Sequence, residues 1–500
     1  MKRRLLLFAL LLTLPFGLAL AQSEPSGTLE LAVDQAPVGL DPHVVTAFSS
    51  FAVLSQIYDG LVENNAELQV EPALAESWEI SEDGLTYTFT LRGGVTFHNG
   101  RALTAEDVVY SYERIMAEET GSPQASRFSQ VESAEAVDEQ TVVFTLSEPF
   151  APFLANTANL SVVPSEVAES EDLNQTAVGT GPFTLAEVVP DTYVLLNAYS
   201  DYYREGEPGL AALRYNVVPE ASTRAAGLRN GTYHLLPDVD PATAQTLSGV
   251  SGVTILETQD LAYSLLGLNV TVPPFDNPQV REAINLIIDR DEIVEAVYFG
   301  QGVPGGPLSP GLSDYAVDPS AFSCYTHDVE AAQALLEEAG VSDLSFDILT
   351  FGTNKIVSDT AQVIQAQLVD AGVNAEVNVE EFGNFVQRWQ NSDFDAFVSL
   401  NGGNVDPDGY LYRTFYSDGA TNVFQYSNDE VDALLEQGRT QSETSERQAT
   451  YETLQQQLAC TGPVVHVAYG TLLTGIRDEV QGFTQMPTRS LVSLREVTLE

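Results

Sequence analysis

The chain has 500 residues, which is too long for one ordinary domain and predicts about two to four lobes. Hydrophobic residues make up 44% of it, so the chain can bury a substantial core, and disorder over most of its length is excluded. Its 71 Asp and Glu outnumber 21 Lys and Arg, a formal net charge of −50. This charge argues against binding to nucleic acid or to an anionic membrane surface, because like charges repel.

The first residues have the pattern of a secretory signal peptide. A basic start at residues 2–4 precedes a short apolar run at residues 5–14 and the small-residue exit Ala19–Leu20–Ala21. A transmembrane anchor is the weaker interpretation, because the run is short and is broken by a proline and a glycine. We expect cleavage after Ala21 and export to the periplasm, with no cysteine at the cleavage point to carry a lipid anchor.

The first half of the mature chain mixes strands and helices. Apolar residues alternate with threonines over residues 85–91, which predicts a half-buried strand. Thr104 and Asp107 have the spacing of a capping box and predict the start of a helix. The residues that this helix would bury at helical spacing are Val108, Tyr112, Ile115 and Met116. Another strand is expected at residues 141–146 and a hairpin over residues 179–197.

The second half has a more regular pattern. Asn277 followed by Pro278 predicts the start of a helix. Residues 334–341 and 367–373 each end a helix at a glycine, and each is followed by an apolar strand. Repeated units of this kind favour an α/β fold with a mostly parallel sheet covered by helices on both faces.

The chain has two cysteines, Cys324 and Cys460, far apart in the sequence. A disulfide between them is the favoured interpretation, because an exported protein folds in an oxidising compartment. The alternative is two buried, unpaired thiols. Zinc binding and redox catalysis are disfavoured, because there is no C-x-x-C motif and two ligands cannot complete a zinc site.

The sequence contains no recognisable catalytic motif. It lacks a G-x-S-x-G elbow, an H-E-x-x-H motif and a Walker-type loop, and Gly179–Phe183 lacks the third glycine of a dinucleotide loop. The five histidines are scattered, and none lies four residues from another. We therefore predict no catalytic residue, no cofactor and no metal site, and we expect that the protein is not an enzyme.

One long stretch of sequence resembles a known family signature. Residues 75–92, continuing through residues 94–100 and 103–111, resemble the signature of the peptide/nickel family (family 5) of periplasmic solute-binding proteins, which serve ABC importers. Further family-like blocks appear in chain order, one before this stretch at Leu40–Pro42 and the others after it at Gly179–Phe183, Pro273–Asn277, Val280–Arg281, Ile288–Arg290, Ala331–Gly340, Asp406–Asp408, and Arg447 with Tyr451. The resemblance covers essentially the whole mature chain.

The resemblance implies a two-lobed clamp of the type II periplasmic-binding-protein kind, with mixed sheets and an extra subdomain on the first lobe. The ligand of such a clamp lies between the lobes, and hinge closure buries it. By analogy the chain divides into a signal peptide (1–21), lobe I (28–56, 175–261 and 475–500), a subdomain (57–174) and lobe II (262–474). The implied partners are a small polar solute and the membrane subunits of an ABC permease, and a monomer is expected.

The expected ligand site departs from the peptide-binding pattern. Peptide-binding members have a tryptophan, two small residues and an aspartate that pairs with the peptide α-amine, just before an Asp-Pro element. Here Leu400 stands in place of the tryptophan and Gly403 in place of the aspartate. Burying an α-amine without a carboxylate is costly, so either another group takes over or the ligand lacks that amine. The residues that would take over are Asn401, Asn404, Asp406 and Asp408.

A strand end rich in glycine and asparagine also suits a neutral polar ligand such as an oligosaccharide, which some family members bind. The mature chain has only two tryptophans, so stacking on a sugar would have to come from tyrosine and phenylalanine. Nickel complexes, opines and glutathione-like peptides are further family ligands. Metal binding draws no support here, because no pair of histidines is present.

Four more residues are candidates for the cleft or its rim. Lys355 is the one lysine that remains after export, and in peptide-binding relatives a basic residue in this neighbourhood meets the ligand carboxylate. The alternative for Lys355 is an ordinary surface lysine. Tyr263 and Asn269 flank the strand that is expected to enter the second lobe, and Phe48 lies in the loop expected after the first strand.

The sequence thus predicts the extracytoplasmic solute-binding component of an ABC importer, which captures a peptide or another polar solute and delivers it to the permease. An oligosaccharide-binding member of the same family is the alternative. From other classes, a sensor or chaperone that presents its ligand to a receptor and an extracytoplasmic enzyme on the same scaffold stay open. The excess acidic charge is interpreted as surface charge on a soluble carrier.

Overall fold

The computed structural model describes residues 25–45 and 47–500. The predicted signal peptide and its cleavage site after Ala21 lie outside the described residues. Within the described part of the chain, no helix is long and apolar enough to cross a membrane.

An 11-stranded sheet forms the centre of the molecule. Its strands are, in spatial order, β15 (Asn374–Glu380), β14 (Ser345–Phe351), β16 (Ala396–Asn401), β12 (Val253–Leu268), β17 (Val464–Arg477), β11 (Leu235–Leu236), β1 (Thr28–Val33), β10 (Ala212–Val217), β9 (Tyr193–Ala198) and β8 (Phe183–Val189), with β13 (Gly302–Pro304) paired to β17. The β14 strand is parallel to β15 and β16, as the repeated units predict. The sheet as a whole is mixed rather than mostly parallel, because its central strands pair antiparallel.

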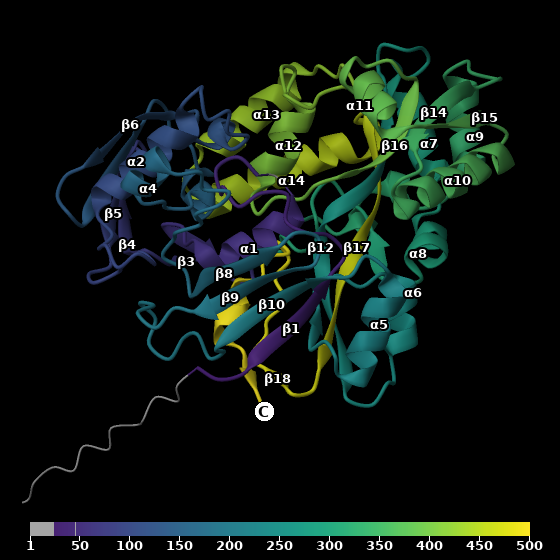
Figure 1. The fold of residues 1–500 in the computed structure, drawn as a ribbon. Coiled ribbons are helices and arrows are strands. Elements are labelled where there is room, and N and C mark those ends of the chain that lie inside the picture. Colours follow the sequence, from purple (N-terminus) through teal and green to yellow (C-terminus); the bar gives the residue numbers. More distant parts are fainter. Residues whose placement is uncertain (1–24, 46) are drawn as a thin grey trace, which may run out of the picture.

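Two long strands connect the two halves of this sheet. The β12 strand pairs antiparallel with β17 from Val253 opposite Arg477 to Gly267 opposite Val464, with shifts of register on the way. In Figure 1 both strands run through the middle of the molecule, from the level of β1 up to the helices around α12 and α14.

Helices cover the sheet on both sides. Their bounds are α1 (Phe48–Ile57), α5 (Ala221–Asn230), α6 (Pro241–Leu247), α7 (Pro278–Ile287), α8 (Arg290–Tyr298), α9 (Val329–Glu338), α10 (Lys355–Asp370), α11 (Phe382–Gln390), α12 (Pro407–Phe415), α13 (Asp429–Thr440) and α14 (Thr444–Thr461). The predicted start of α7 is confirmed: Asn277 accepts a hydrogen bond from the backbone N–H of Gln279 at 3.0 Å, and Pro278 is in the first turn.

A separate four-stranded sheet lies at the left of Figure 1, next to α12 and α13. Its order is β4 (Ala75–Ile80), β5 (Thr86–Leu91), β7 (Thr141–Leu146) and β6 (Val131–Ala136), accompanied by β2 (Val62–Asn64), β3 (Val70–Pro72), α2 (Ala105–Met116), α3 (Phe153–Asn156), α4 (Ser165–Ser170) and the 3₁₀ turn η1 (Ala125–Phe128). We call this unit the subdomain.

The subdomain bears out the local sequence signals. Tyr87, Phe89 and Leu91 of β5 are buried, while the threonines between them are half-buried. The carboxylate of Asp107 accepts a hydrogen bond from the backbone N–H of Thr104 at 3.0 Å and completes the capping box of α2. The prediction that α2 buries Met116 is wrong: Met116 is the last residue of the helix and is 36% exposed, whereas the other three predicted core residues are buried.

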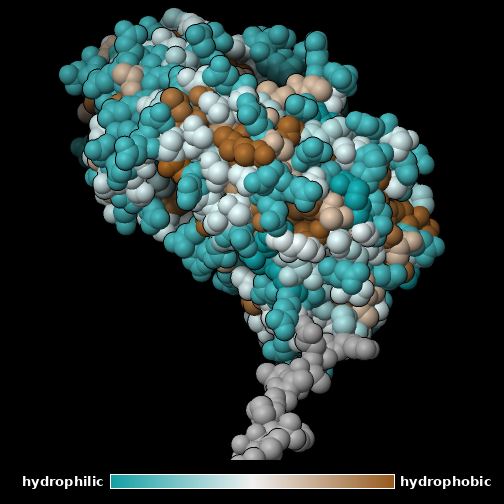
Figure 2. All heavy atoms as spheres, turned by 90° about the vertical axis from the view of Figure 1, so that its left-hand side faces the viewer, coloured by the Kyte–Doolittle hydropathy of each residue, from teal (hydrophilic) through white to brown (hydrophobic). Residues whose placement is uncertain are grey.

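The buried apolar residues form separate cores. The large core joins β12–β17 to α7–α14. The small core lies around β1, β8–β10, α1 and residues 480–497, and a third cluster fills the space between the subdomain sheet and α2. On the face that carries the subdomain, hydrophilic side chains predominate and hydrophobic ones appear in small groups, as expected for a strongly acidic surface (Figure 2).

A disulfide joins Cys324 to Cys460, with a Cα–Cα distance of 5.6 Å. Cys324 is buried in the 3₁₀ turn Ser323–Tyr325, and Cys460 lies in the last turn of α14. The bond therefore fastens the long loop that precedes α9 to the helix that leads into β17.

Candidate functional site

The pairing of β12 with β17 is interrupted near the middle of β12. The register shifts between Gln259 and Tyr263, so the backbone groups in this gap are free for other partners. The carbonyl of Asp260 accepts a hydrogen bond from the hydroxyl of Ser309 at 2.9 Å. The carbonyl of Leu261 accepts one from the hydroxyl of Tyr410 at 2.6 Å. This break in β12 is the point around which most of the predicted site residues gather.

Phe48 lies on one side of the break. It is the first residue of α1, and its side chain is 66% exposed. The guanidinium carbon of Arg489 is 5.5 Å from the centre of the Phe48 ring, and the same guanidinium donates to the Asp260 carboxylate at 2.6 Å. The ion pair thus ties the C-terminal segment to β12 and places an exposed aromatic ring beside the break, where a ligand can reach it.

Tyr263 and Asn401 lie together on the other side of the break, opposite each other on β12 and β16. The amide of Asn401 donates to the hydroxyl of Tyr263 at 2.8 Å, and its carbonyl oxygen accepts from Arg413 at 2.8 Å. Tyr263 itself is fully buried, and burial raises the pKa of its hydroxyl. Tyr263 therefore serves as a support that orients Asn401, which is the partly exposed member of the pair.

The Gly403 backbone lies against β12. A Cβ atom added at Gly403 would overlap the Cβ and the carbonyl group of Leu261. The site therefore has no room for the aspartate that peptide-binding relatives carry at this position. Asn404 does not replace it, because its carbonyl oxygen accepts from the backbone N–H of Asp406 at 3.1 Å and shapes the turn into α12.

The two aspartates at the start of α12 already have partners. Asp406 binds Arg447 through both oxygens, at 2.6 and 2.7 Å. Asp408 binds Arg439 through both oxygens, at 3.1 and 3.2 Å, and burial raises the pKa of Asp408 to about 6 although Arg439 lowers it. Our suggestion that Asp406 or Asp408 takes over the amine-binding role is corrected, because an arginine already neutralises each carboxylate.

Asn269 does not join this group. It follows the end of β12, about 20 Å along the chain from Tyr263 at the usual rise of a strand. Its amide donates to the carbonyls of Ser392 and Phe394, both at 3.1 Å, and its oxygen accepts from Thr271. The amide N–H groups and the oxygen of the Asn269 side chain thus all have partners in a turn of the fold, and none is left to bind a ligand.

Lys355 stands apart as well. It is the first residue of α10, directly after the loop that follows β14, and its side chain is 81% exposed. Its ammonium pairs with Asp359 one helical turn on, at 2.6 Å. This arrangement matches the surface-lysine alternative, and an exposed pair of this kind holds the side chain only weakly.

Sequence reasoning missed two arginines of this region, Arg413 and Arg127. Arg413 on α12 donates to Asn401 and to the Gly402 carbonyl, the latter at 3.1 Å. Arg127 on η1 of the subdomain is half-buried, and burial together with the positive charge of Arg413 lowers the pKa of Arg127. No local motif marks either residue.

A second contact joins the subdomain to the same region. The backbone N–H of Ala151 donates to the carbonyl of Arg439 at 2.8 Å. The guanidinium carbon of Arg439 lies 3.4 Å from the centre of the Tyr412 ring and 5.1 Å from that of Phe150. The subdomain therefore packs against α13 at Arg439, next to Tyr412 of α12.

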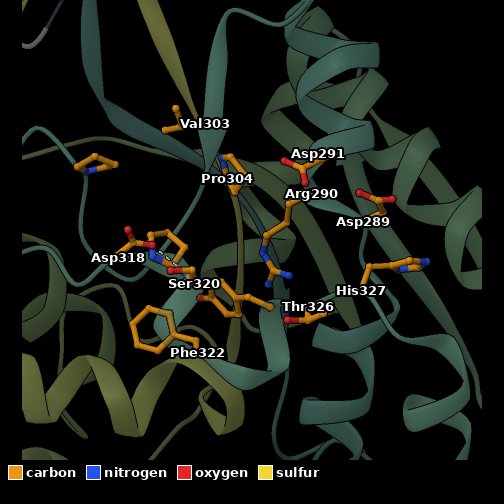
Figure 3. Close-up of a pocket in the computed structure, with 13 residues that line it drawn as sticks. Asp289, Arg290, Asp291, Val303, Pro304, Asp318, Ser320, Phe322, Thr326 and His327 are labelled. Carbon is orange, nitrogen blue, oxygen red and sulfur yellow. Dashed lines mark hydrogen bonds between the residues drawn. The ribbon is translucent and has the colours of Figure 1, made fainter.

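A cavity of about 540 Å³ lies elsewhere, among α8, β13 and residues 318–327. In Figure 3 Arg290 extends between Asp289, Asp291 and His327 on one side and Asp318 on the other. Arg290 is buried, and its guanidinium carbon is 3.8 Å from the Tyr325 ring centre. The cavity contains none of the predicted site residues, and no group suited to hold a metal ion occurs among the described residues.

Comparisons with known proteins agree with the architecture. The family model for bacterial extracellular solute-binding proteins, family 5 (middle region), matches residues 69–422. The heme-binding protein A of Haemophilus influenzae is 31% identical over 93% of this chain and 91% of its own, and the dipeptide-binding protein of Escherichia coli is 29% identical over 94% of each. The structure of the Helicobacter pylori binding protein DppA in complex with the peptide STSA is 29% identical, with a TM-score of 0.80 over 95% of this chain and 98% of that one.

Proposed function

Because this chain belongs to the bacterial extracellular solute-binding proteins of family 5, we propose that it captures a peptide or peptide-like solute between two lobes and hands it to the membrane permease of an ABC importer. The observation that carries the proposal is the family match, which spans residues 69–422 and includes the strands and helices on both sides of the break in β12. Delivery to a permease and action as a monomer in the periplasm are parts of the same proposal.

A peptide is favoured over an oligosaccharide as the ligand. Relatives of this chain include proteins named for dipeptide binding and one solved with a bound peptide. Sugar sites use exposed aromatic faces, yet Trp78 packs against the subdomain core and Trp389 against the large core. Phe48 is the exposed aromatic ring beside the break. We propose that the ligand contacts Phe48, Asn401 and the backbone of Gly403.

The proposed lobes follow the separate cores. Lobe I comprises residues 28–56, 175–261 and 475–500, the subdomain residues 57–174, and lobe II residues 262–474. The small core supports the first division and the large core the last. The strands β12 and β17 pass from one lobe to the other, and the gap in their pairing makes this the place where the lobes can bend. Ligand contacts that exist only in the closed form would drive closure.

The family consists of solute-binding proteins, and we propose that this chain likewise has no catalytic activity. The polar groups around the break include arginines, an asparagine and carboxylates that pair with arginine. The hydroxyls of Ser309 and Tyr410 donate to backbone carbonyls rather than to a base, so this arrangement suits binding rather than nucleophilic attack. A role as a sensor that presents its ligand to a receptor would use the same closed state and differs only in the partner.

The test is a melting-temperature screen of the mature protein with dipeptides, tripeptides, oligopeptides and oligosaccharides. A bound solute at about a hundred times its Kd stabilises the folded state by about 2.7 kcal/mol, so one class should raise Tm clearly. Asn401→Ala should abolish the shift and Lys355→Gln should keep it. Should no solute raise Tm, and should native mass spectrometry find no copurified solute, the proposal is wrong.

A further inference from the structure

The cavity of about 540 Å³ between α8 and β13 lies within the proposed lobe II, and its lining includes none of the residues proposed to contact the transported solute (Figure 3). Arg290 and Phe322 are buried members of this lining and Tyr325 is half-buried; we call these three residues the floor. The exposed carboxylates of Asp291 and Asp318 form part of the rim. The volume is in the range of pockets that bind small molecules.

Arg290 carries a buried positive charge without a countercharge. Its Nε donates to the His466 carbonyl and one Nη2 hydrogen donates to the side-chain oxygen of Asn285, both at 2.8 Å. Nη1 donates to the carbonyls of Asn285 and Ile288 at 3.3 and 3.5 Å, so every partner is neutral. No carboxylate in the described part of the chain forms an ion pair with Arg290, and its second Nη2 hydrogen has no acceptor there. A buried guanidinium of this kind is destabilising unless an anion meets it.

The Tyr325 hydroxyl is a second donor without an acceptor. The guanidinium carbon of Arg290 lies 3.8 Å from the centre of the Tyr325 ring, and the buried hydroxyl makes no hydrogen bond to the described residues. Burial raises the pKa of Tyr325 to about 12, so the hydroxyl keeps its proton at neutral pH, and Arg290 cannot accept that proton because a guanidinium only donates. Buried polar groups normally have partners, so these two donors indicate that an acceptor binds at the floor.

The floor is held in place from two sides. Tyr325 ends the 3₁₀ turn Ser323–Tyr325, which the disulfide from Cys324 to Cys460 fastens to α14. On the other side, the hydrogen bond from Arg290 to the His466 carbonyl ties the start of α8 to β17. The two donors therefore keep their positions without a ligand, as expected of a preformed site.

The rim carries the opposite charge. Asp291 and Asp318 lie on either side of Arg290 in Figure 3, and neither forms an ion pair within residues 25–45 and 47–500. Asp289, a third carboxylate of the lining, caps α8 by accepting from the backbone N–H of Glu292 at 3.0 Å. A simple anion would be repelled by the rim, and a simple cation would leave the donors of the floor unpaired. A zwitterion satisfies both.

We propose that this cavity binds a free amino acid or a similar small zwitterion, whose carboxylate accepts from Arg290 and Tyr325. Its ammonium lies at the rim beside Asp291 or Asp318, and its side chain packs on the buried ring of Phe322. Guanidinium and ammonium groups both form charge-assisted hydrogen bonds with carboxylates, so each end of the ligand has a matching partner. The site is separate from the cleft between the lobes and goes beyond the proposed function.

Titration calorimetry on the mature protein, refolded with its disulfide to remove any copurified solute, tests the ligand class with three probes. These are L-leucine, L-leucinamide, which lacks the carboxylate, and N-acetyl-L-leucine, which lacks the ammonium. Leucine should bind roughly tenfold to a hundredfold more tightly than either derivative, because each derivative loses a charge-assisted contact. Glycine and L-phenylalanine extend the test to zwitterions of other sizes.

Arg290 itself also holds backbone carbonyls of the fold, so the variants leave it intact. Tyr325→Phe should weaken leucine binding about threefold to tenfold without lowering Tm, because the hydroxyl has no partner to lose. Tyr202→Phe is the matched control: it removes another buried hydroxyl without a partner, in lobe I, and should leave leucine binding unchanged. The double variant Asp291→Asn with Asp318→Asn should weaken leucine binding but not the binding of N-acetyl-L-leucine.

The proposal is overturned if none of the three amino acids binds, if both derivatives bind as tightly as leucine, or if Tyr325→Phe keeps full affinity. Asn401→Ala, which alters the proposed cleft, should leave leucine binding unchanged. Binding that Asn401→Ala removes and Tyr325→Phe keeps would place the amino acid in the cleft, which rejects the cavity site and leaves the proposed function intact. Leucine binding that follows the expected pattern in a protein that no peptide stabilises would support the cavity site and reject the peptide function alone.

Discussion

Asp406 and Arg447 form a buried ion pair in which both carboxylate oxygens accept from the guanidinium, at 2.6 and 2.7 Å. The pair joins the first residue before α12 to α14, and Arg447 also donates to the Gly438 carbonyl at 2.7 Å. The Asp406–Arg447 pair therefore fixes the orientation of α12 relative to α14. Because α12 carries Arg413, which donates to Asn401 at 2.8 Å, the pair also helps to hold Asn401 in place.

Asp406→Asn should lower the free energy of unfolding by about 3–5 kcal/mol, because it leaves Arg447 buried without its countercharge. Urea unfolding followed by circular dichroism measures this loss. Lys355→Gln is the matched control: it breaks an exposed pair and should cost less than about 1 kcal/mol. Equal losses in the two variants would contradict the structural role of the buried pair.

The disulfide gives a second prediction. The Cys324–Cys460 bond closes a loop with a sequence separation of 136 residues, so it restricts the unfolded chain strongly. Replacing both cysteines with serine should lower the free energy of unfolding by roughly 2–5 kcal/mol. Reduction of the wild type should lower its urea midpoint similarly, whereas a reductant should not affect the double variant. Identical midpoints for the oxidised wild type and the variant would show that the bond adds no stability.

Local structure was predictable where the signal itself is local. The capping box at Thr104, the start of α7 at Asn277 and the alternation in β5 each depend on residues within one turn or one strand, and each is confirmed. The parallel pairs around β14 also follow from the repeated helix–strand units. The central antiparallel pair was not predicted, because Val253 opposite Arg477 is a long-range pairing that no local pattern encodes.

The site was only partly predictable for the same reason. The family pattern already indicated that Gly403 replaces an aspartate, and the structure adds that Leu261 leaves no space for a side chain there. Asn269 has an amide side chain of the kind that binds polar ligands, but its hydrogen bonds stabilise a turn of the fold. Arg413 reaches Asn401 and the Gly402 carbonyl only because α12 packs beside the end of β16, and nothing in the sequence around Arg413 distinguishes it from a surface arginine.

His466 should make the protein sensitive to acid. It is fully buried, neither ring nitrogen has a hydrogen-bond partner within the described chain, and burial lowers its pKa to about 3. In the unfolded chain histidine titrates near pH 6.5, so between about pH 6.5 and pH 3 the unfolded state binds a proton at His466 and the folded state does not. Stability is therefore fully present above about pH 6.5 and falls as the pH drops toward 3, by up to about 1.4 kcal/mol per pH unit for this one group.

The test compares urea unfolding at pH 7.5 and pH 5.5 for the wild type and for His466→Phe. The substitution should reduce the loss between the two pH values by about 1 kcal/mol, with no loss of stability at pH 7.5, because no hydrogen bond is removed. Other buried groups keep their own pH dependence in both proteins: the pKa of His43 is lowered by burial to about 4, and that of Asp408 is raised. An unchanged difference between the two pH values would exclude His466 as a source of acid sensitivity.

The two neighbouring glycines at the end of β16 provide the most selective test of the site. A Cβ added at Gly402 meets nothing within 4 Å, whereas one added at Gly403 would overlap Leu261 at the break in β12. Gly403→Ala should therefore cost about 1–3 kcal/mol in unfolding free energy and weaken ligand binding, since the loop must move away from β12 and displace Asn401. Gly402→Ala should stay within about 0.5 kcal/mol of the wild type and bind normally.

Gly403→Asp extends this test to ligand choice. If the missing aspartate were all that the site lacks for binding a free α-amine, restoring it should create a preference for a tripeptide with a free amine over its N-acetylated form. The structure predicts the opposite, because the new side chain has no space beside Leu261. The loop at Gly403 must then move away from β12, and the new carboxylate does not reach the position in which it would bind an amine. We expect weaker binding of both forms and no new preference in calorimetry. A gain of selectivity for the free amine in Gly403→Asp would show that the loop can accept a side chain and that the glycine alone sets the ligand class.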